Sequence, residues 1–378
     1  MAPHGKNQAA DRHFRDHGKW LGVARAIDDL RRGLPVKLRH GEDVELACAI
    51  ETVGQTSFSE LFEGSAARTR ILISANRART LHIPDKGRQA VALTFDQNFG
   101  IDDLRALADP TEDLLRPLSG PYQRTKHEET EIDRAALRLC KLARLLPAAL
   151  VATPGNGSDA GGLEESLLEV LAEAVGAFPE DEAASLREVA RATVPLEGAE
   201  DAKIVIFRPE LGGAEHLALL IGTFEPDDAV LTRVHSACLT GDILGSLKCD
   251  CGQQLRGALK TISEAGGGIL LYLAQEGRGI GLAAKIKAYS LQDQGFDTLE
   301  ANLRLGFEAD ERLFAPAAKI LEQLGVWRVR LLTNNPEKVA ALEALGIEVG
   351  EMVGHAFPPN PHNEDYLRTK REKAGHHL

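Results

Sequence analysis

Three cysteines in the second half of the chain lie close enough in sequence to share chemistry. Cys238, Cys249 and Cys251 form a C-x10-C-x-C pattern in the stretch RVHSACLTGDILGSLKCDCGQQL. Thiolates are soft ligands that suit zinc, and a predicted turn before Gly252 lets both sulfurs of the C-x-C pair reach one ion. Structural zinc sites have four protein ligands, whereas catalytic sites have three and leave a position for water. Three cysteines therefore favour an open, catalytic zinc site.

The alternative is a closed structural zinc site with His235 as the fourth ligand. His235 lies three residues before Cys238, which is close enough for coordination if the backbone turns between them. However, RVHS is typical of a strand, and residues i and i+3 of a strand point to opposite faces. The spacing thus favours catalytic over structural zinc.

Two segments combine a cationic side chain with the start of a predicted helix. Arg278 lies in the glycine-rich stretch QEGRGIG, and Lys338 follows TNNPE, where the chain turns into a helix. Backbone N–H groups at a helix N-terminus favour phosphate. Taken alone, GRGIG also fits a tight turn and Lys338 also fits a surface position on a helix.

The three longest motifs of the C-terminal half together resemble one enzyme family, GTP cyclohydrolase II. They are RVHSACLTGDILGSLKCDCGQQL, YLAQEGRGIGLAAKIKAYSLQDQGFDTLEANLRLGFEADER and LLTNNPEKV, and the resemblance runs from about residue 203 to the C-terminus. It implies hydrolytic opening of the guanine imidazole ring of GTP with release of formate and diphosphate. The product would be 2,5-diamino-6-ribosylamino-4(3H)-pyrimidinone 5′-phosphate, in the first step of riboflavin biosynthesis.

The resemblance also implies the cofactors. It implies one zinc ion per chain on the three cysteines and magnesium at the GTP phosphates. This agrees with the chemistry, because opening a ring at C8 needs a water nucleophile, and zinc lowers the pKa of bound water from about 15.7 towards about 7. Three thiolates make a weaker Lewis acid than three histidines, so nearby donors must help. Tyr289, in KAYSLQ, matches the family's tyrosine near the zinc.

The remaining site residues come from the family match. Asp310 and Arg312, in EADER, match the family's proton acceptor and nucleophile. A guanidinium stays protonated and has no free lone pair, so stabilising the departing diphosphate is the more plausible role for Arg312. ADER alone also fits a helix start. The residues expected to contact nucleotide are Arg233, Val234, His235, Ser236, Ala237, Gln254, Glu276, Gly277, Arg278, Thr298, Thr333 and Lys338.

One departure from the family pattern is visible in this set. Many relatives have glutamate where this chain has Ala237, so this chain offers no side-chain carboxylate at that position.

The first half resembles a degenerate 3,4-dihydroxy-2-butanone-4-phosphate synthase. The matching pieces are AIDDLRRGLPV, LRALADPTEDLLRP and AALRLCKLARLLPAALVA. The acidic stretch of the synthase is reduced to Glu42, Asp43 and Glu45. Its His-Thr-Glu is replaced by Ile132, Asp133 and Arg134. The nearby His127, Glu128 and Glu129 are candidate replacements for these ligands, but their sequence favours a solvated loop, and we expect no synthase activity.

Hydrophobic spacing and turn residues divide the chain into four parts. They are a flexible tail (1–20), a synthase-like domain (21–152), a linker with acidic helices (153–200) and a cyclohydrolase II domain (201–378). Strands and helices alternate, so we expect an α/β to α+β fold with a mixed sheet in the second domain and a smaller α+β domain before it. Cys140 falls within a predicted helix and is best interpreted as a buried structural thiol.

Composition restricts the function classes. The 378 residues include 56 acidic and 44 basic ones, a net charge of −12, which argues against a general nucleic-acid or membrane-surface binder. The polar N-terminus has no signal-peptide core, so we expect a cytoplasmic protein with reduced thiols. We expect a homodimer that takes GTP as substrate, with other riboflavin-pathway enzymes as candidate partners.

Two rival functions remain open. One is a zinc-containing paralogue that acts on another nucleotide or stops at the formamide. The other is a zinc-stabilised nucleotide-binding regulator without turnover. The presence of Asp310, Arg312 and Tyr289 argues against the regulator.

Overall fold

The computed structural model describes residues 5–62, 68–95, 99–116, 120–154, 166–225, 228–364, 368, 371 and 372. Residues 1–4 of the predicted tail and residues 155–165 of the predicted linker lie outside this description. The chain forms two compact units. Unit 1 is Met1–Phe178 with Ala283–Asp310, and unit 2 is Pro179–Leu282 with Glu311–Leu378. No helix in the described part is long and apolar enough to span a membrane.

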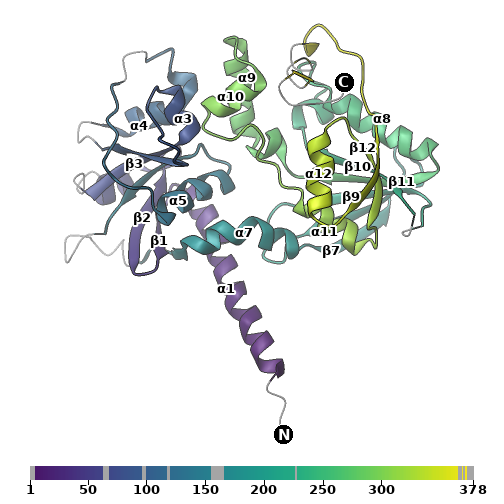
Figure 1. Ribbon diagram of the computed structural model, residues 1–378, viewed down its shortest axis with the longest axis horizontal. Helices are drawn as coiled ribbons and strands as arrows, with labels where there is room; N and C mark the ends of the chain where they lie inside the picture. The colour runs from purple at the N-terminus through teal and green to yellow at the C-terminus, as the bar shows by residue number, and fades with distance from the viewer. Residues whose placement is uncertain are drawn as a thin grey trace. The chain divides into compact units, whose positions relative to one another are not determined.

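Unit 1 is built on a six-stranded sheet of order β4-β3-β5-β2-β1-β6. Strands β1, β2 and β3 of this sheet are labelled in Figure 1. All neighbouring strands are antiparallel except β1 and β6, which are parallel. Its elements are α1 (Gly5–Arg31), β1 (Val36–His40), β2 (Asp43–Ala49), α2 (Gln55–Ser57), η1 (Phe58–Phe62), β3 (Thr69–Ser74), α3 (Ala75–Thr80), β4 (Ala90–Thr94), α4 (Ile101–Ala108), η3 (Pro110–Glu112), α5 (Glu131–Leu142), β5 (Ala148–Ala152), β6 (Glu169–Leu171), α9 (Leu282–Asp293) and α10 (Thr298–Arg304). Helix α7 (Ala172–Ala184) begins in unit 1 and continues into unit 2 from Pro179.

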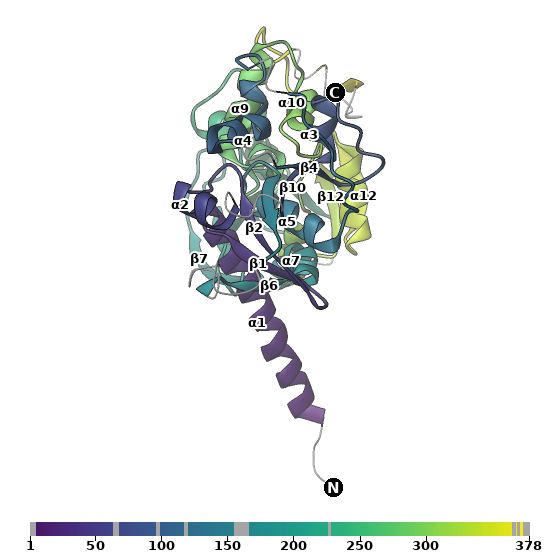
Figure 2. The same cartoon turned by 90° about the vertical axis from the view of Figure 1, so that its left-hand side faces the viewer.

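The core of unit 1 lies between the sheet and α1 and α5 (Figure 2). α5 begins at a capping box in which Thr130 and Asp133 exchange hydrogen bonds between side chain and backbone. Its apolar residues recur at helical spacing, so Ile132, Ala136 and Leu139 all face the core. Cys140 is fully buried among them, which confirms the expected structural thiol.

A segment far along the chain completes unit 1. Residues Ala283–Asp310, which carry most of α9 and all of α10, pack with the first half of the chain. Asn76 donates from Nδ2 to the carbonyl of Phe307 at 2.8 Å. Lys287 on α9 places Nζ 2.6 Å from a carboxylate oxygen of Asp109 and 3.2 Å from one of Glu51. Part of the longest cyclohydrolase-like motif therefore belongs to the same unit as the synthase-like half.

Unit 2 contains a seven-stranded sheet of order β13-β12-β10-β11-β9-β8-β7. The strands β13, β12, β10 and β11 are parallel, and β9, β8 and β7 continue the sheet antiparallel. Its elements are β7 (Arg187–Thr193), β8 (Lys203–Arg208), β9 (His216–Gly222), β10 (Val230–Ser236), η4 (Leu239–Ile243), α8 (Cys251–Glu264), β11 (Gly267–Leu273), η5 (Glu276–Gly279), α11 (Ala315–Gln323), β12 (Arg328–Leu332), α12 (Pro336–Ala344) and β13 (Glu348–Val353).

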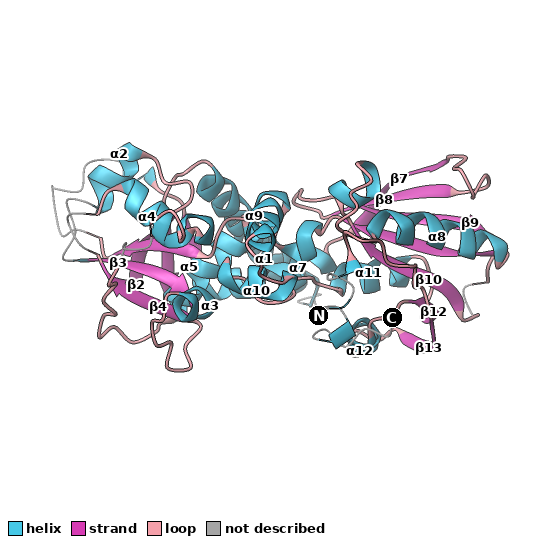
Figure 3. Ribbon diagram, turned by 90° about the horizontal axis from the view of Figure 1, so that it is seen from above, coloured by secondary structure: helices cyan, strands magenta, loops and turns pink. Residues whose placement is uncertain are grey.

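Helices cover both faces of the second sheet, so unit 2 has two apolar layers. α8 lies on one face of the sheet (Figure 3). Its residues Ala258 and Ile262 are fully buried there. α11 and α12 pack on the other face, where Ile320, Leu321 and Leu342 are fully buried. Both units are mixed α/β structures, and the predicted fold class is confirmed.

Three local predictions differ from the structure. The second acidic helix expected after the linker is strand β7, because REVARAT pairs along its length with β8 and this pairing overrides helix propensity. The helix expected to start at ADER begins only at Ala315. The segment predicted as a tail is helical from Gly5, in a stretch that has no proline and no β-branched residue before Val23.

Candidate metal centre and nucleotide site

The three cysteines converge on one point at the carboxyl end of β10. Cys238 follows the strand, Cys249 precedes α8 and Cys251 opens it. Their sulfur atoms all lie within 4.8 Å of one another, and the Sγ atoms of Cys238 and Cys249 are 3.8 Å apart. Tetrahedral zinc with Zn–S bonds of about 2.3 Å requires sulfurs roughly 3.8 Å apart. The spacing therefore fits a metal ion.

A glycine makes room for this cluster. The backbone N–H of Gly241 donates to Cys238 Sγ at 3.3 Å. A Cβ at Gly241 would lie 2.7 Å from Cys249 Sγ and 2.9 Å from Cys251 Cβ. The turn at residues 239–243 thus lies so close to the sulfurs that any side chain at position 241 would clash with the cysteines.

The thiols also need a cation to become thiolates together. The hydrogen bond with Cys238 and burial raise the pKa of Cys249 to about 11. Hydrogen bonds with Cys238 and Cys249 raise the pKa of Cys251 well above its ordinary value. Three thiolates at this distance repel one another, so a bound cation is what stabilises the deprotonated cluster.

His235 belongs to a second cluster beside the cysteines. Its Nε2 lies 3.2 Å from both carboxylate oxygens of Asp242, and its ring stacks on Tyr272 with centroids 5.5 Å apart. Asp242 also accepts hydrogen bonds from the Tyr272 hydroxyl at 3.0 Å and from the backbone N–H of Cys238 at 2.9 Å. Among the described residues, the group of converging ligand atoms contains the three cysteines and not His235.

Asp242 and Tyr272 were missed by sequence reasoning. The available signal for Asp242 was an acidic residue four positions after a ligand cysteine. Tyr272 gave no signal, because it reaches Asp242 only through the pairing of β10 with β11.

The predicted cations and amides meet at the carboxyl ends of the parallel strands. Arg233 donates from Nη1 to the carbonyl of Leu332 at 2.7 Å and from Nη2 to Gln254 Oε1 at 2.5 Å. Gln254 in turn donates to Asp250 at 2.5 Å. Lys338 donates to the carbonyl of Val234 at 2.9 Å. Ligands of open α/β sheets bind at this edge.

Several buried polar atoms at this edge have no hydrogen-bond partner among the described residues. They are Arg233 Nε, His235 Nδ1, Ser236 Oγ and Gln275 Oε1. Buried polar groups are normally satisfied, so four unsatisfied ones within two adjacent strand ends call for a ligand. Gln275 was also missed by sequence reasoning, although it directly precedes the EGR motif.

The glycine-rich segment is a strained turn before a helix. Gly277 and Arg278 both have left-handed backbones, with φ of 64° and 60°. Such a backbone is uncommon for arginine and marks a functional constraint. Glu276 accepts hydrogen bonds from the N–H groups of Leu239 at 2.7 Å and Gly277 at 3.0 Å, which ties this turn to the cysteine turn.

The last predicted site residues are divided between the units. Arg312 lies in unit 2, in the loop before α11, with its guanidinium carbon 5.8 Å from the Phe314 ring centre. Thr333 in unit 2 accepts the backbone N–H of Asn335 at 3.1 Å. Tyr289, Thr298 and Asp310 belong to unit 1, and their approach to the cysteines remains a prediction.

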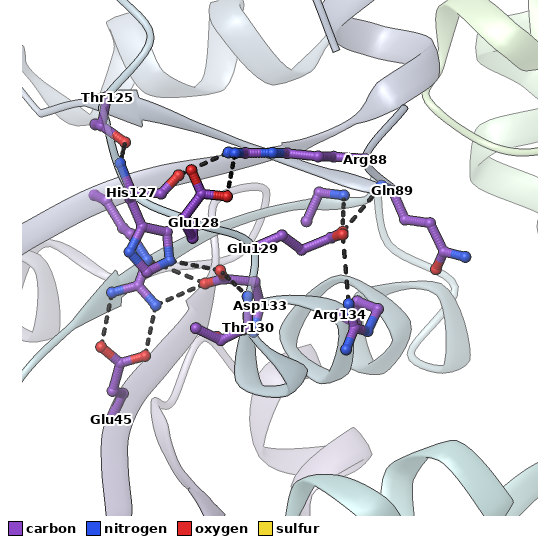
Figure 4. A network of polar contacts seen from close by, with 12 residues as sticks. Glu45, Arg88, Gln89, Thr125, His127, Glu128, Glu129, Thr130, Asp133 and Arg134 are labelled. Carbon is purple, nitrogen blue, oxygen red and sulfur yellow. Dashed lines mark hydrogen bonds and ion pairs between the residues drawn. The ribbon is translucent and has the colours of Figure 1, made fainter. Parts of the chain in front are cut away.

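A buried ion-pair network occupies unit 1 where the sequence predicted a solvated loop (Figure 4). Asp133 is only 1% exposed and accepts hydrogen bonds from Arg70, from the Thr130 N–H and from His127 Nε2, the last at 2.6 Å. Arg70 also forms a bidentate pair with Glu45 at 2.7 and 2.5 Å.

Residues 127–129 form a loop, as predicted, but two of the three side chains are partly buried and not solvated. His127 is partly buried against Asp133, and Glu129 accepts the backbone N–H groups of Gln89 and Ala90. Glu128 alone is largely exposed, at 86%.

Comparison with known proteins shows the family to which the chain belongs. The family model described as GTP cyclohydrolase II matches residues 187–354. A protein of Azospirillum brasilense named GTP cyclohydrolase-2 is 46% identical over 365 residues, which cover 96% of this chain and 95% of that protein. The chain belongs to the GTP cyclohydrolase II family. Its predicted function as an enzyme of this type in riboflavin biosynthesis is confirmed.

Other relatives span both halves. The Riboflavin biosynthesis protein RibBA of Phocaeicola vulgatus is 40% identical over 400 aligned positions, covering 94% of this chain and 97% of that protein. Among solved structures, RibBX of A. baumannii, a two-domain 3,4-dihydroxy-2-butanone 4-phosphate synthase, aligns with 89% of this chain at 17% identity and a TM-score of 0.30.

Proposed function

We propose that this GTP cyclohydrolase II family member binds one zinc ion on Cys238, Cys249 and Cys251 and opens the imidazole ring of GTP. Formate and diphosphate leave, and 2,5-diamino-6-ribosylamino-4(3H)-pyrimidinone 5′-phosphate remains. The observation that carries the proposal is the set of four unsatisfied buried polar atoms, on Arg233, His235, Ser236 and Gln275, of which the first lies five residues before Cys238. Bound zinc would supply a Lewis acid that makes water nucleophilic at neutral pH.

The chain's own residues divide between the two ends of the nucleotide. At the base end, His235 Nδ1, Ser236 Oγ and Gln275 Oε1 offer free hydrogen-bonding positions to a heterocycle. Gln275 is fixed, because its Nε2 donates to the carbonyl of Leu313 at 2.5 Å and leaves its Oε1 to accept. Tyr289 would add a donor for the attacked purine.

At the phosphate end, Arg233 and Arg312 lie close enough for their charges to interact. Burial, and to a lesser extent the charge of Arg312, lower the pKa of Arg233 to about 10. Holding two like charges near each other is unfavourable unless an anion lies between or beside them. We assign Arg312, with Asp310 as its partner, to the departing diphosphate, where magnesium also binds. Lys338 and Arg278 complete the set of cations.

Product analysis tests this proposal directly. Zinc-loaded protein incubated with GTP and magnesium should release formate and diphosphate in equal amounts and form the diaminopyrimidine. Another nucleotide that turns over in preference to GTP would favour the paralogue, and GTP binding without turnover would favour the regulator. Either result would contradict the proposal.

Two variants distinguish an open zinc site from a closed one. Cys249→Ser should lose both zinc and ring opening while the fold survives, because unit 2 has its own apolar core. His235→Ala should keep zinc, as measured by metal analysis, because His235 is engaged with Asp242. Equal loss of zinc in both variants would mean a closed structural site.

We also propose a cytoplasmic homodimer. Light scattering on the purified protein should give twice the mass of one chain, and a monomer that turns over GTP would overturn this part.

A further inference from the structure

The segment that follows the last strand folds back onto α8. We call residues 354–363 the C-terminal strap. Asn334, just after β12, holds its start: Asn334 Nδ2 donates to the carbonyl of His355 at 2.8 Å, and the N–H of His355 donates to Asn334 Oδ1 at 2.7 Å. Both residues are buried. Two hydrogen bonds between the same two residues fix the strap at this point.

The strap contacts α8 at two positions one helical turn apart. His355 Nε2 lies 2.7 Å from the backbone carbonyl of Gln254, which can only accept, so this nitrogen carries the proton. The Phe357 ring packs edge-on against His355 with centroids 4.9 Å apart. It also fills the surface above Gly257, where an added Cβ would lie 2.2 Å from the ring.

The contacted turn of α8 carries the site. Cys251 opens the helix, and the Gln254 side chain connects Arg233 with Asp250, the residue between two cysteines. The side chain of Gln254 spans these partners at 2.5 Å on both sides, so a small shift of its backbone breaks at least one bond. The Gln254 carbonyl is the point at which His355 contacts this arrangement.

We propose that His355 is a positioning residue for GTP binding, which acts by fixing Gln254 and through it Arg233. The inference rests on the proposed function, in which both residues contact nucleotide. His355 itself touches neither metal nor substrate.

The test compares three variants of the full-length, zinc-loaded enzyme. His355→Ala removes the donor and should raise KM for GTP by about five-fold with a smaller change in kcat, since one hydrogen bond of ordinary strength is lost. His355→Gln keeps a donor at similar reach and should restore KM. His362→Ala is the matched control, because His362 lies exposed on the same strap. Zinc content should be unchanged in all three.

Hydrogen exchange provides a readout that does not depend on turnover. His355→Ala should speed amide exchange in the first turns of α8 and leave α11 unchanged. If the wild-type enzyme converts GTP, either of two results would overturn the inference: a KM that is unchanged in His355→Ala, or a raised KM that persists in His355→Gln. If the wild-type protein does not convert GTP, the proposed function fails separately, and unchanged exchange in α8 would overturn the inference on its own.

Discussion

At the scale of single residues, the proposed zinc site depends on a glycine as much as on its cysteines. Gly241 donates its N–H to Cys238 Sγ and leaves no space for a side chain. Hydrogen-bond donors around ligand sulfurs orient the sulfurs and affect the affinity for the metal. The cysteines could be found from their spacing, whereas the role of Gly241 depends on the fold of the turn at residues 239–243.

Gly241→Ala should weaken zinc binding. The added methyl group would sit 2.7 Å from Cys249 Sγ, so at least one sulfur must move. We expect zinc affinity to fall by roughly 10–100-fold, the usual effect of losing support around a ligand. Competition with a chromophoric chelator measures it. Gly22→Ala is the control, because nothing lies within 4 Å of its Cβ position. Wild-type zinc affinity in Gly241→Ala would contradict this assignment.

Arg312 should be needed for diphosphate release and not for zinc. Loss of a charged contact in the transition state typically costs about 10²–10³ in rate, so Arg312→Ala should lower kcat by that factor. Diphosphate release and metal content are measured on the same sample. Arg312→Lys separates two roles, because an amine can act as a nucleophile but cannot replace a planar bidentate donor. Normal diphosphate release by Arg312→Ala would rule out the assignment.

At the scale of elements, the sequence correctly predicted the helices that are marked by a local pattern of apolar spacing or capping residues. α5 has helical spacing and a capping box, α8 has helical spacing, and α12 has an Asn335 cap followed by proline, and all three form as expected. REVARAT has no such local signature, and its strand conformation comes from pairing with β8. The Glu45–Arg70–Asp133 network was likewise invisible, because it joins three elements that only the fold of unit 1 brings together.

The C-terminal strap should make the fold sensitive to acid. Burial, and then the charge of Arg233, lower the pKa of His355 to about 4, with Asp250 opposing and His235 adding to the shift. An unfolded histidine titrates near about 6.5. Above that pH the residue is neutral in both states and contributes nothing. As pH falls from there towards 4, the unfolded chain binds a proton that the native chain does not, so stability declines.

Urea unfolding at pH 7.5, 5.5 and 4.5 measures this effect. Wild-type protein should lose more stability across this range than His355→Gln, which has no titrating group at the position. The difference between the two proteins in this loss of stability gives the contribution of His355, separate from those of the carboxylates and the other histidines. Parallel losses in both would show that His355 does not titrate in this window.

At the scale of the whole molecule, sequence order and structural units do not coincide. The motif that runs from the EGR segment to EADER is continuous in sequence, yet residues 283–310 pack into unit 1 and Arg312 into unit 2. From the sequence, the motif was assigned to one domain because it is continuous. Continuity along the chain does not show which parts of the motif pack together. The contacts of Asn76 and Lys287 show that the synthase-like half packs against the segment that carries α9 and α10 and so supports it structurally.

That structural role leads to the last prediction, that the first half does not convert ribulose 5-phosphate. The synthase reaction needs a metal on oxygen ligands and acid–base groups around the sugar. In unit 1 the guanidinium of Arg70 pairs with both Glu45 and Asp133, so neither carboxylate is left unpaired for a metal, and Ile132 is a core residue. His127 is bound to the same Asp133. Full-length protein given ribulose 5-phosphate and magnesium should therefore form neither dihydroxybutanone phosphate nor formate, while the same sample releases formate from GTP. Formate in proportion to added ribulose 5-phosphate would mean that the network opens and that the half retains its own chemistry.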